Sequence, residues 1–217
     1  MMSPSFAYPT LYLASSNPGK LRELRRAGLE AGVPVESLPE FRSLPVCVED
    51  GQTFEQNSRK KALHYATLTR RLVLAEDSGL VVDALAGRPG VYSARFSGTG
   101  ATDELNNGKL IEELSRVASA RAQRPVGEPA EGDRLFPAHY ACVIALAQDG
   151  NCLAVTEGRV DGMIIEAPKG SGGFGYDPHF FYPPFGKTFA EITASEKSAV
   201  SHRGVAFRKL IDYLASR

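Results

Sequence analysis

The sequence predicts an α/β protein with a mixed central sheet, and three observations lead to that expectation. Short apolar runs typical of buried strands alternate with segments whose apolar residues recur at helical spacing. Two long strand-like runs, residues 139–147 and 152–160, flank the sequence QDGN at 148–151, which is a strong hairpin signal. Because a hairpin joins antiparallel strands, the sheet cannot be purely parallel.

The chain is expected to begin with a strand, a turn and a helix. The strand is predicted over residues 10–14, the turn over 15–19, and the helix over 20–31, where the apolar residues share one face. A second helix should start after the capping residue Thr53 and end near Leu68.

The next strand contains the most informative pair of residues, Glu76 and Asp77. The apolar run at 72–75 predicts a buried strand, and Gly79 is expected to end it in a turn. The two carboxylates then lie at a strand end, where open α/β sheets place their ligand sites. Paired carboxylates there suit Mg²⁺, which binds one or two carboxylates together with substrate phosphates. A solvated acidic turn is the alternative.

Two further helices and one loop complete the expected organisation. Thr102 can cap a helix from Asp103 to about residue 118, and a final helix is expected from about 197 to 214. Residues 121–137 are rich in Pro, Gly and charge, which predicts a mobile loop insertion rather than a domain linker. We therefore expect residues 1–217 to form a single domain.

Composition excludes several classes of function. The chain of 217 residues is 43% hydrophobic and 23% charged, which is ordinary for a globular protein. Its 25 basic and 25 acidic residues give no net charge, so we expect neither nucleic acid nor membrane as a partner. The three cysteines lack metal-ligand spacing, and the N-terminus lacks a signal-peptide pattern. No apolar run approaches the roughly 18 residues of a membrane span. We expect a cytoplasmic protein.

Two glycine-containing segments imitate phosphate-binding motifs. Residues 170–175, GSGGFG, match the dinucleotide pattern, but the turn-forming residues YDP follow where a helix is required. Residues 186–188, GKT, resemble the end of a Walker loop, but Phe181 stands where that motif needs glycine. We interpret these glycines as sites of tight bends or close backbone approach.

Three other groups of polar residues are candidates for ligand binding. The turn SSNPGK at 15–20 precedes a helix, so its backbone N–H groups and Lys20 could bind an anion, although simple helix capping is the alternative. Asn57 and Lys61 share a helix face that is otherwise expected to be solvated. Hydrogen-bond donors also cluster near the C-terminus, on Lys197 and on the consecutive residues His202 and Arg203. A lone histidine is more often structural.

Four blocks occur in a fixed order along the chain: SSNPGK at 15–20, EDGQTFEQNSRKKA at 49–62, EDSGLVVDALAGRPGVYSARF at 76–96 and GGFGYDPHFFYPPFGKTFAEITASEKSAVSHR at 172–203. Together they resemble the inosine triphosphate pyrophosphatase family over about residues 11–214. The resemblance implies Mg²⁺-dependent hydrolysis of dITP, ITP and XTP to the monophosphate and pyrophosphate. It also implies an elongated fold with two lobes around a substrate cleft, and a homodimer.

The resemblance further implies roles for the residues at matching positions. Asp77 would be the general base and, with Glu49, a metal ligand, and Glu76 would assist. Glu76 departs from the family, which usually has aspartate there, so the resemblance leaves the ligand set open at this position. The substrate would be held by a larger set: Ser15, Ser16, Asn17, Pro18, Gly19, Lys20, Lys61, Ser78, Phe174, Gly175, Tyr176, Asp177, Lys197, His202 and Arg203.

Within that set, the donors Lys197, His202 and Arg203 would recognise the oxygen at ring position 6, which adenine lacks. Phe174 or Tyr176 could stack on the base, or could be core aromatics instead. How guanine is rejected does not follow from these residues. Two other functions remain open: hydrolysis of modified pyrimidine triphosphates, and a sensing module that binds nucleotides without hydrolysing them.

Overall fold

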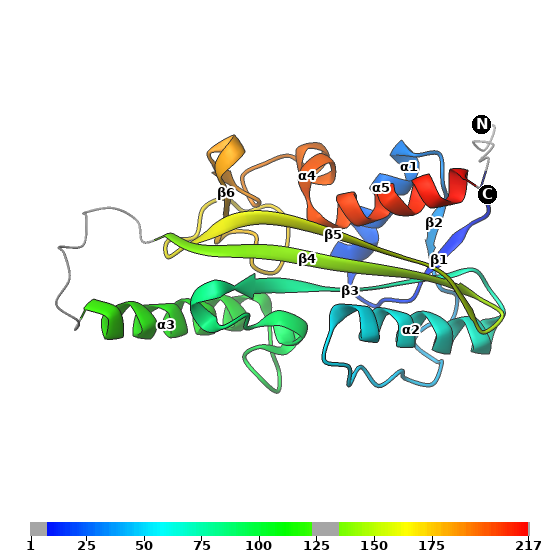
Figure 1. Cartoon of the computed structure of the whole chain (residues 1–217), viewed down its shortest axis with the longest axis horizontal. Coiled ribbons are helices and arrows are strands. Elements are labelled where there is room, and N and C mark those ends of the chain that lie inside the picture. Colours follow the sequence, from blue (N-terminus) through cyan, green and yellow to red (C-terminus); the bar gives the residue numbers. More distant parts are fainter. Residues whose placement is uncertain (1–7, 123–134, 217) are drawn as a thin grey trace. The chain divides into compact units, whose positions relative to one another are not determined.

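The computed structural model describes residues 8–122 and 135–216 and contains a seven-stranded sheet flanked by helices (Figure 1). In the described residues the strand order is β2-β1-β3-β4-β5-β6-β7. The strands are β1 (Leu11–Leu13), β2 (Val35–Ser37), β3 (Val73–Val82), β4 (Leu135–Gln148), β5 (Asn151–Ile165), β6 (Phe180–Tyr182) and β7 (Lys187–Thr188). β1 pairs in parallel with β2 and β3, whereas β6 is antiparallel to β5 and β7. The predicted α/β class and mixed sheet are confirmed.

The longer helices are α1 (Pro18–Glu30), α2 (Phe54–Thr69), α3 (Asp103–Ala122), α4 (Ala194–Val200) and α5 (His202–Ala215). The predicted cap of α2 is confirmed, because the Thr53 hydroxyl accepts a hydrogen bond from the Gln56 N–H at 3.1 Å. The predicted hairpin is also confirmed: β4 and β5 are joined by Asp149 and Gly150, whose φ angles are 48° and 77°. Positive φ at both central residues is typical of a tight two-residue hairpin turn. No helix in the described residues is long and apolar enough to cross a membrane.

The chain divides into two compact units, which are described separately. The first comprises residues 1–78, 141–159 and 198–217, and the second comprises residues 79–140 and 160–197. The long strands β3, β4 and β5 contribute residues to both units.

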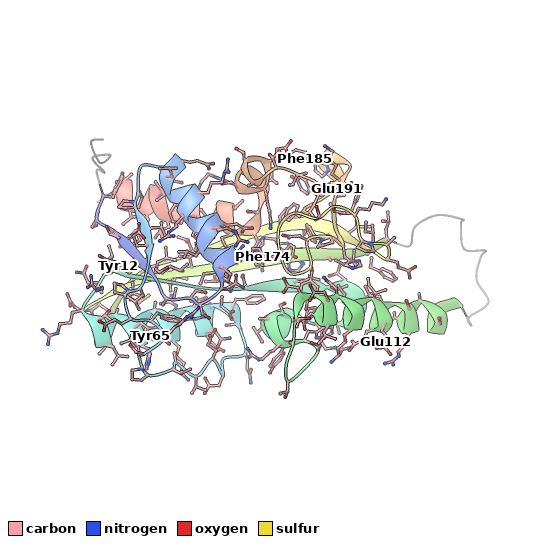
Figure 2. All side chains as sticks on the ribbon, turned by 180° about the vertical axis from the view of Figure 1, so that it is seen from behind. Tyr12, Tyr65, Glu112, Phe174, Phe185 and Glu191 are labelled. Carbon is pink, nitrogen blue, oxygen red and sulfur yellow. The ribbon has the colours of Figure 1, made fainter. Side chains whose placement is uncertain are left out.

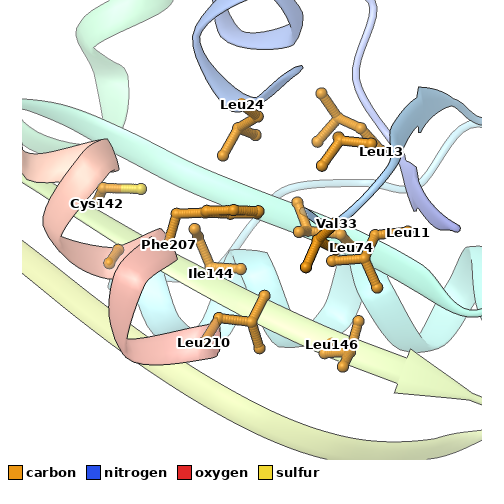
Figure 3. Packing of buried hydrophobic residues seen from close by; sticks show 12 residues of the cluster. Leu11, Leu13, Leu24, Val33, Leu74, Cys142, Ile144, Leu146, Phe207 and Leu210 are labelled. Atoms are coloured by element: carbon orange, nitrogen blue, oxygen red, sulfur yellow. The ribbon is translucent and has the colours of Figure 1, made fainter. Parts of the chain in front are cut away.

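The first unit buries both faces of its part of the sheet. Leu74 of β3 and Ile144 of β4 pack with Phe207 of α5 in one apolar cluster, which also includes residues from α1 (Figure 3). Their strand neighbours belong to a second cluster on the α2 side, where Tyr65 lies (Figure 2). Because side chains alternate along a strand, α1 and α5 cover one face and α2 covers the other. Residues on both faces of β3 are therefore shielded from water.

The second unit has an aromatic core. Tyr140, the last residue of this unit's part of β4, packs against Phe180 with ring centroids 4.6 Å apart, and Phe180 packs against Phe189 at 4.8 Å. A 3₁₀ helix over Gly90–Arg95 and helix α3 belong to the same unit.

The prediction that Gly79 ends a strand in a turn is wrong. β3 continues through Glu76 and Asp77 to Val82, so the two carboxylates are inside the strand and not at its end. An added Cβ at Gly79 would lie 2.3 Å from Ser93 Oγ and 2.4 Å from Gly90 O. The glycine therefore permits the 3₁₀ helix to approach the strand closely.

Three predicted boundaries also need correction. The first helix begins at Pro18, since Asn17 is its cap, so the predicted turn is shorter. The final helix is two helices, because Ser201 has extended backbone angles and caps α5 with a 3.2 Å bond from the Gly204 N–H. Of the predicted loop at 121–137, residues 121–122 belong to α3 and 135–137 to β4, and the remainder lies outside the described residues.

Candidate active site

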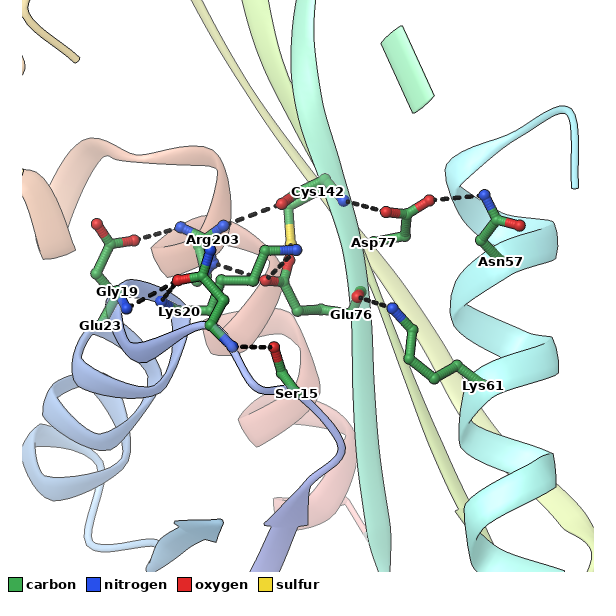
Figure 4. Close-up of polar contacts among 12 residues, drawn as sticks. Ser15, Gly19, Lys20, Glu23, Asn57, Lys61, Glu76, Asp77, Cys142 and Arg203 are labelled. Carbon is green, nitrogen blue, oxygen red and sulfur yellow. Dashed lines mark hydrogen bonds and ion pairs between the residues drawn. The ribbon is translucent and has the colours of Figure 1, made fainter. Parts of the chain in front are cut away.

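Glu76 and Asp77 lie on opposite faces of β3 (Figure 4). Because successive side chains of a strand alternate, Glu76 is directed toward Lys20 and Arg203, whereas Asp77 is directed toward Asn57 on α2. The two carboxylates therefore do not form a pair at a strand end, and each has its own surroundings.

Glu76 is buried among cations. It is 1% exposed, and its Oε1 lies 3.1 Å from Lys20 Nζ and 3.2 Å from Arg203 Nε. The Cys142 thiol donates a hydrogen bond to the other oxygen at 3.2 Å. Burial by itself would raise the pKa of Glu76, but Arg203 and Lys20 outweigh it and hold the pKa well below its usual range. Glu76 therefore stays ionised at any physiological pH.

Arg203 extends this charged cluster at the start of α5. Its guanidinium pairs with Glu23 of α1 as well as with Glu76, and Nη2 donates to Ser78 Oγ at 3.0 Å. Glu76 and Glu23 thus balance the charges of Lys20 and Arg203, as buried ions require. The neighbouring His202 is also buried. The predicted contact of these two residues with a nucleobase stays a prediction.

The turn at 15–20 provides fewer backbone donors than the sequence suggests. Asn17 Oδ1 caps α1 by accepting from Gly19 N at 2.8 Å and Lys20 N at 3.1 Å, and Pro18 has no N–H. Ser15 Oγ accepts from Asn17 N at 3.2 Å. The capping alternative is thus confirmed, and phosphate binding by residues 15–20 stays a prediction in which the Lys20 side chain is the main attractive group.

Asp77 has neutral hydrogen-bond partners. Its Oδ2 accepts from Asn57 Nδ2 at 2.9 Å, its Oδ1 accepts from Ser78 N at 3.1 Å, and the residue is 8% exposed. Burial raises the pKa of Asp77; Asn57 and the nearby Lys20 and Lys61 act against this shift, and Glu49 adds to it. A buried carboxylate with a raised pKa and a fixed orientation is suited to accept a proton.

Lys61 lies beside this carboxylate on the same face of α2 as Asn57. Its Nζ donates to Glu49 Oε2 at 2.6 Å and to the backbone oxygen of Glu76 at 3.2 Å. Asn57 is held in turn by Gly51 N, which donates to its Oδ1 at 2.8 Å. The predicted shared face is confirmed, and the solvated-face alternative is wrong because both Asn57 and Lys61 are buried.

Glu49 and Asp77 are the predicted metal ligands, and Glu49 lies near enough to Asp77 to raise its pKa. The described residues contain no group of three or more His, Cys, Asp or Glu side chains arranged to hold a metal. Two carboxylates nevertheless fit Mg²⁺, a hard cation that keeps several waters and takes further oxygens from substrate phosphates. The mutual repulsion that helps to raise the pKa of Asp77 would be relieved by a cation near both groups. Both oxygens of Glu76 have partners on the opposite face of β3 from Asp77, and the roles of Glu49, Asp77 and Glu76 as ligands all stay predictions.

The predicted base-binding residues of the second unit form a compact turn. Asp177 Oδ2 accepts from Phe174 N at 2.8 Å and pairs with Lys197 Nζ. That ammonium group lies 4.9 Å from the centroid of the Phe174 ring, a cation–π contact. Tyr176 is buried, and its hydroxyl donates to Ser93 O at 2.8 Å. Tyr176 is therefore a core aromatic, as the alternative held, whereas Phe174 is only half buried.

The structure thus divides the predicted site residues between its two units. The first unit contains Ser15, Ser16, Asn17, Pro18, Gly19, Lys20, Glu49, Lys61, Glu76, Asp77, Ser78, His202 and Arg203, and the second contains Phe174, Gly175, Tyr176, Asp177 and Lys197.

Sequence reasoning missed several partners of these residues. Glu23 could have been suspected, because it lies three positions after Lys20 on the same helix face. Cys142 and Ser93 gave no local signal, since their contacts to Glu76 and Tyr176 cross 66 and 83 positions of the chain.

The chain is similar to proteins of one known family. A model of the Ham1 family matches residues 11–213. A dITP/XTP pyrophosphatase from Geobacter sulfurreducens is 46% identical over 94% of this chain and 96% of its own length. One from Desulfotalea psychrophila is 42% identical over 93% of this chain and 83% of its own length.

Solved structures agree in fold. A HAM1 protein from Coxiella burnetii superposes with a TM-score of 0.79 at 36% identity, covering 97% of this chain and 100% of that chain. The Staphylococcus aureus Ham1 protein gives a TM-score of 0.76 at 32% identity, covering 96% of this chain and 99% of its own.

Proposed function

The chain belongs to the Ham1 family, and from that premise we propose that it is a nucleoside triphosphate pyrophosphatase acting on non-standard purines. The substrates are dITP, ITP and XTP, and the products are the monophosphate and pyrophosphate. Relatives named dITP/XTP pyrophosphatase support this proposal. The structural observation behind it is Asp77, a buried carboxylate with a raised pKa that Asn57 holds in place beside Lys61.

Asp77 is the general base in this proposal. It accepts a proton from the attacking water, whose oxygen bonds to phosphorus as the anhydride bond between the α and β phosphates breaks, which releases the monophosphate and pyrophosphate. A carboxylate in this role typically contributes a factor of about 10²–10⁴ in rate. Asn57 keeps the accepting oxygen oriented, since its own amide is fixed by Gly51.

Lys20 and Lys61 neutralise the triphosphate. The charge of the transition state spreads over phosphoryl oxygens, so positioned cations contribute most of the stabilisation. Glu76 acts indirectly here, because it holds Lys20 and Arg203 in a neutral cluster.

Mg²⁺ is the proposed cofactor, and Glu49 and Asp77 are the residues that would hold it; the family resemblance adds Glu76 in an assisting role. When bound, the cation would neutralise charge on the phosphate oxygens. Removal of divalent cations with a chelator should abolish turnover, and added Mg²⁺ should restore it.

The proposal assigns base recognition to the turn at 174–177 and Lys197 of the second unit and, from the family resemblance, to His202 and Arg203 of the first. Donors of these residues match the oxygen at ring position 6 of hypoxanthine and xanthine, where adenine has an amino group. Sites of this kind can discriminate by about 10⁴-fold or more. Phe174, which is half buried, is the better placed aromatic for stacking, since Tyr176 is buried and bonded to Ser93.

The test is pyrophosphate release from dITP, ITP, XTP, GTP, dTTP and UTP with Mg²⁺, at protein concentrations far below that of the nucleotide. The proposal expects many turnovers on the first three nucleotides and little on the others. Preference for dTTP or UTP would instead assign the chain to pyrimidine triphosphates. Binding of nucleotide without turnover would identify a sensing module and contradict the proposal.

Three further proposals follow. From the family resemblance, residues 1–217 form one pyrophosphatase domain with two lobes around the substrate, and the protein is a homodimer. From its cysteine pattern, the protein is cytoplasmic. Light scattering during size-exclusion chromatography tests the homodimer, because a monomer has a mass of 23.4 kDa and a dimer has twice that mass.

A further inference from the structure

Helix α3 holds the Gly175 backbone at two points. Gly175 N donates to Asp103 Oδ2 at 2.6 Å, and Gly175 O accepts from Asn107 Nδ2 at 3.0 Å. Asp103 and Asn107 are four residues apart at the start of α3, so both side chains project from one helix face. The carboxylate and the amide thus bind the donor and the acceptor of one glycine.

This pair of contacts controls the directions of the residues on either side. The Gly175 N–H belongs to the peptide that joins it to Phe174, and its C=O belongs to the peptide that joins it to Tyr176. The φ angle of Gly175 is +64°, in the left-handed region that glycine adopts without strain. Apart from its two chain neighbours, no heavy atom lies within 4 Å of the position that a Cβ would occupy, so the space there is open. The two hydrogen bonds to α3 restrain the Gly175 backbone, in addition to the bond from Phe174 N to Asp177 Oδ2 within the turn.

The start of α3 is itself firmly attached within the second unit. Asn106 Oδ1 accepts from Ser97 N at 2.8 Å, and Lys109 Nζ donates to Phe96 O at 2.8 Å. Asn106 is buried, which strengthens this attachment. The helix is thus a rigid support, and a shift of the turn relative to α3 requires loss of the Gly175 contacts.

From this geometry we infer that Asp103 and Asn107 are positioning residues that set nucleobase selectivity by fixing the Phe174–Gly175 segment. The inference rests on the proposed function, and it adds two residues that touch neither the phosphates nor the reacting atoms. Loss of either contact frees the backbone beside Phe174, so the base is held less well while the Asp77 chemistry is unchanged.

Two isosteric substitutions separate positioning from mere folding. Asp103→Asn keeps an oxygen that can accept from Gly175 N, so it should behave as the natural protein. Asn107→Asp keeps the shape but loses the donor to Gly175 O and places a negative charge against that oxygen. This variant should therefore differ from the natural protein. Asn107 Oδ1 has no hydrogen-bond partner among the described residues and stays an oxygen in the variant, so the substitution acts at the Nδ2 position, which donates to Gly175 O.

The experiment measures kcat and KM for dITP and dGTP with Mg²⁺. Asp103→Ala and Asn107→Asp should raise KM for dITP about 3- to 10-fold at unchanged kcat, the effect of losing one hydrogen bond used in uniform binding. The ratio of kcat/KM for dITP to that for dGTP should fall by a similar factor. Glu112→Ala is the matched control, since Glu112 lies farther along α3 and pairs with Arg116 on the surface (Figure 2).

The possible outcomes distinguish the two proposals. If the natural protein releases no pyrophosphate from any nucleotide, the proposed function fails and this inference fails with it. If the natural protein is active, but Asp103→Ala and Asn107→Asp keep its KM and its selectivity, only the inference is overturned. The inference is also overturned if KM of Asp103→Asn is raised as much as that of Asp103→Ala. The same holds if Asp103→Ala and Asn107→Asp lower kcat and melting temperature together, since a purely structural role predicts those results.

Discussion

Glu76 and Asp77 are consecutive residues of β3 and both are buried, but they lie on opposite faces of the strand among different partners. Glu76 contacts two cations, and its pKa is lowered. Asp77 contacts an amide and a backbone N–H, and its pKa is raised. Burial acts in the same direction on both carboxylates, so the sign of each shift is decided by the partners.

The magnitudes explain why the cations prevail at Glu76. A unit charge about 4 Å away is worth about 4 kcal/mol at an effective dielectric constant of about 20. Two such partners together exceed the several kcal/mol that burial of one ion costs. The hydrogen bonds that Asp77 accepts are weaker, and the more distant lysines do not reverse the effect of burial. Glu76, the structural acid, and Asp77, the reactive acid, therefore differ in the charge of their neighbours, and not in whether they are buried.

The largest expected effect is on stability, from Glu76→Gln. The substitution leaves the buried charges of Lys20 and Arg203 without their shared partner, which should cost about 3–5 kcal/mol of unfolding free energy. Urea denaturation measures it. Glu36→Gln is the matched control, because the Arg25–Glu36 pair is 48% and 54% exposed and water screens it. Equal stability of the two variants would show that Glu76 is not a structural acid.

Asn57→Ala should lower activity about tenfold, and more strongly at acidic pH. Without the Asn57 donor, the ionised form of Asp77 loses its strongest opposing contact, so its pKa should rise further. The acidic limb of the kcat profile should then move to higher pH, since the base must be ionised to accept a proton. Gln56→Ala, an exposed neighbour on α2, should leave the profile unchanged. An unmoved acidic limb in Asn57→Ala would contradict the assignment of Asp77.

The smallest expected effects are the pH dependences of stability, which have opposite signs. Glu76 has a lowered folded pKa, so its stabilisation is complete above its unfolded pKa of about 4.3 and is lost as pH falls below it. Asp77 has a raised folded pKa, so its ionisation destabilises the fold as pH rises from about 3.9 through the folded value.

Urea denaturation between about pH 3 and pH 7 measures both effects. The stability deficit of Glu76→Gln should shrink toward pH 3. The stability of Asp77→Asn relative to the natural protein should grow from about pH 4 toward pH 7. Parallel curves for the two variants would remove the distinction between the carboxylates.

The features that sequence predicted well are local in the chain. The Thr53 cap and the hairpin at Asp149 and Gly150 depend on residues within a few positions, so their patterns suffice. The roles of Asp77 and Lys61 were expected from the family resemblance, and the structure adds the partners of both.

The features that sequence missed depend on distant segments. The sequence predicts a turn at Gly79, but this residue lies inside β3, where Ser93 and Gly90 pack against it. The Glu76–Arg203 contact spans 127 positions, so no local pattern reveals that Glu76 is neutralised. The support of Gly175 by α3 likewise joins segments 68 and 72 positions apart.

The most direct test of the account is pyrophosphate release from dITP by Asp77→Asn with Mg²⁺, beside the natural protein and at equal folded concentration. Asparagine keeps the size of the side chain and cannot take the proton, but it keeps only one of the two acceptor oxygens that bond Asn57 and Ser78. The fold should persist with unfolding free energy changed by no more than about 1–3 kcal/mol. The account predicts that kcat falls by about 10²–10⁴. A folded Asp77→Asn protein that keeps the kcat of the natural protein would contradict it.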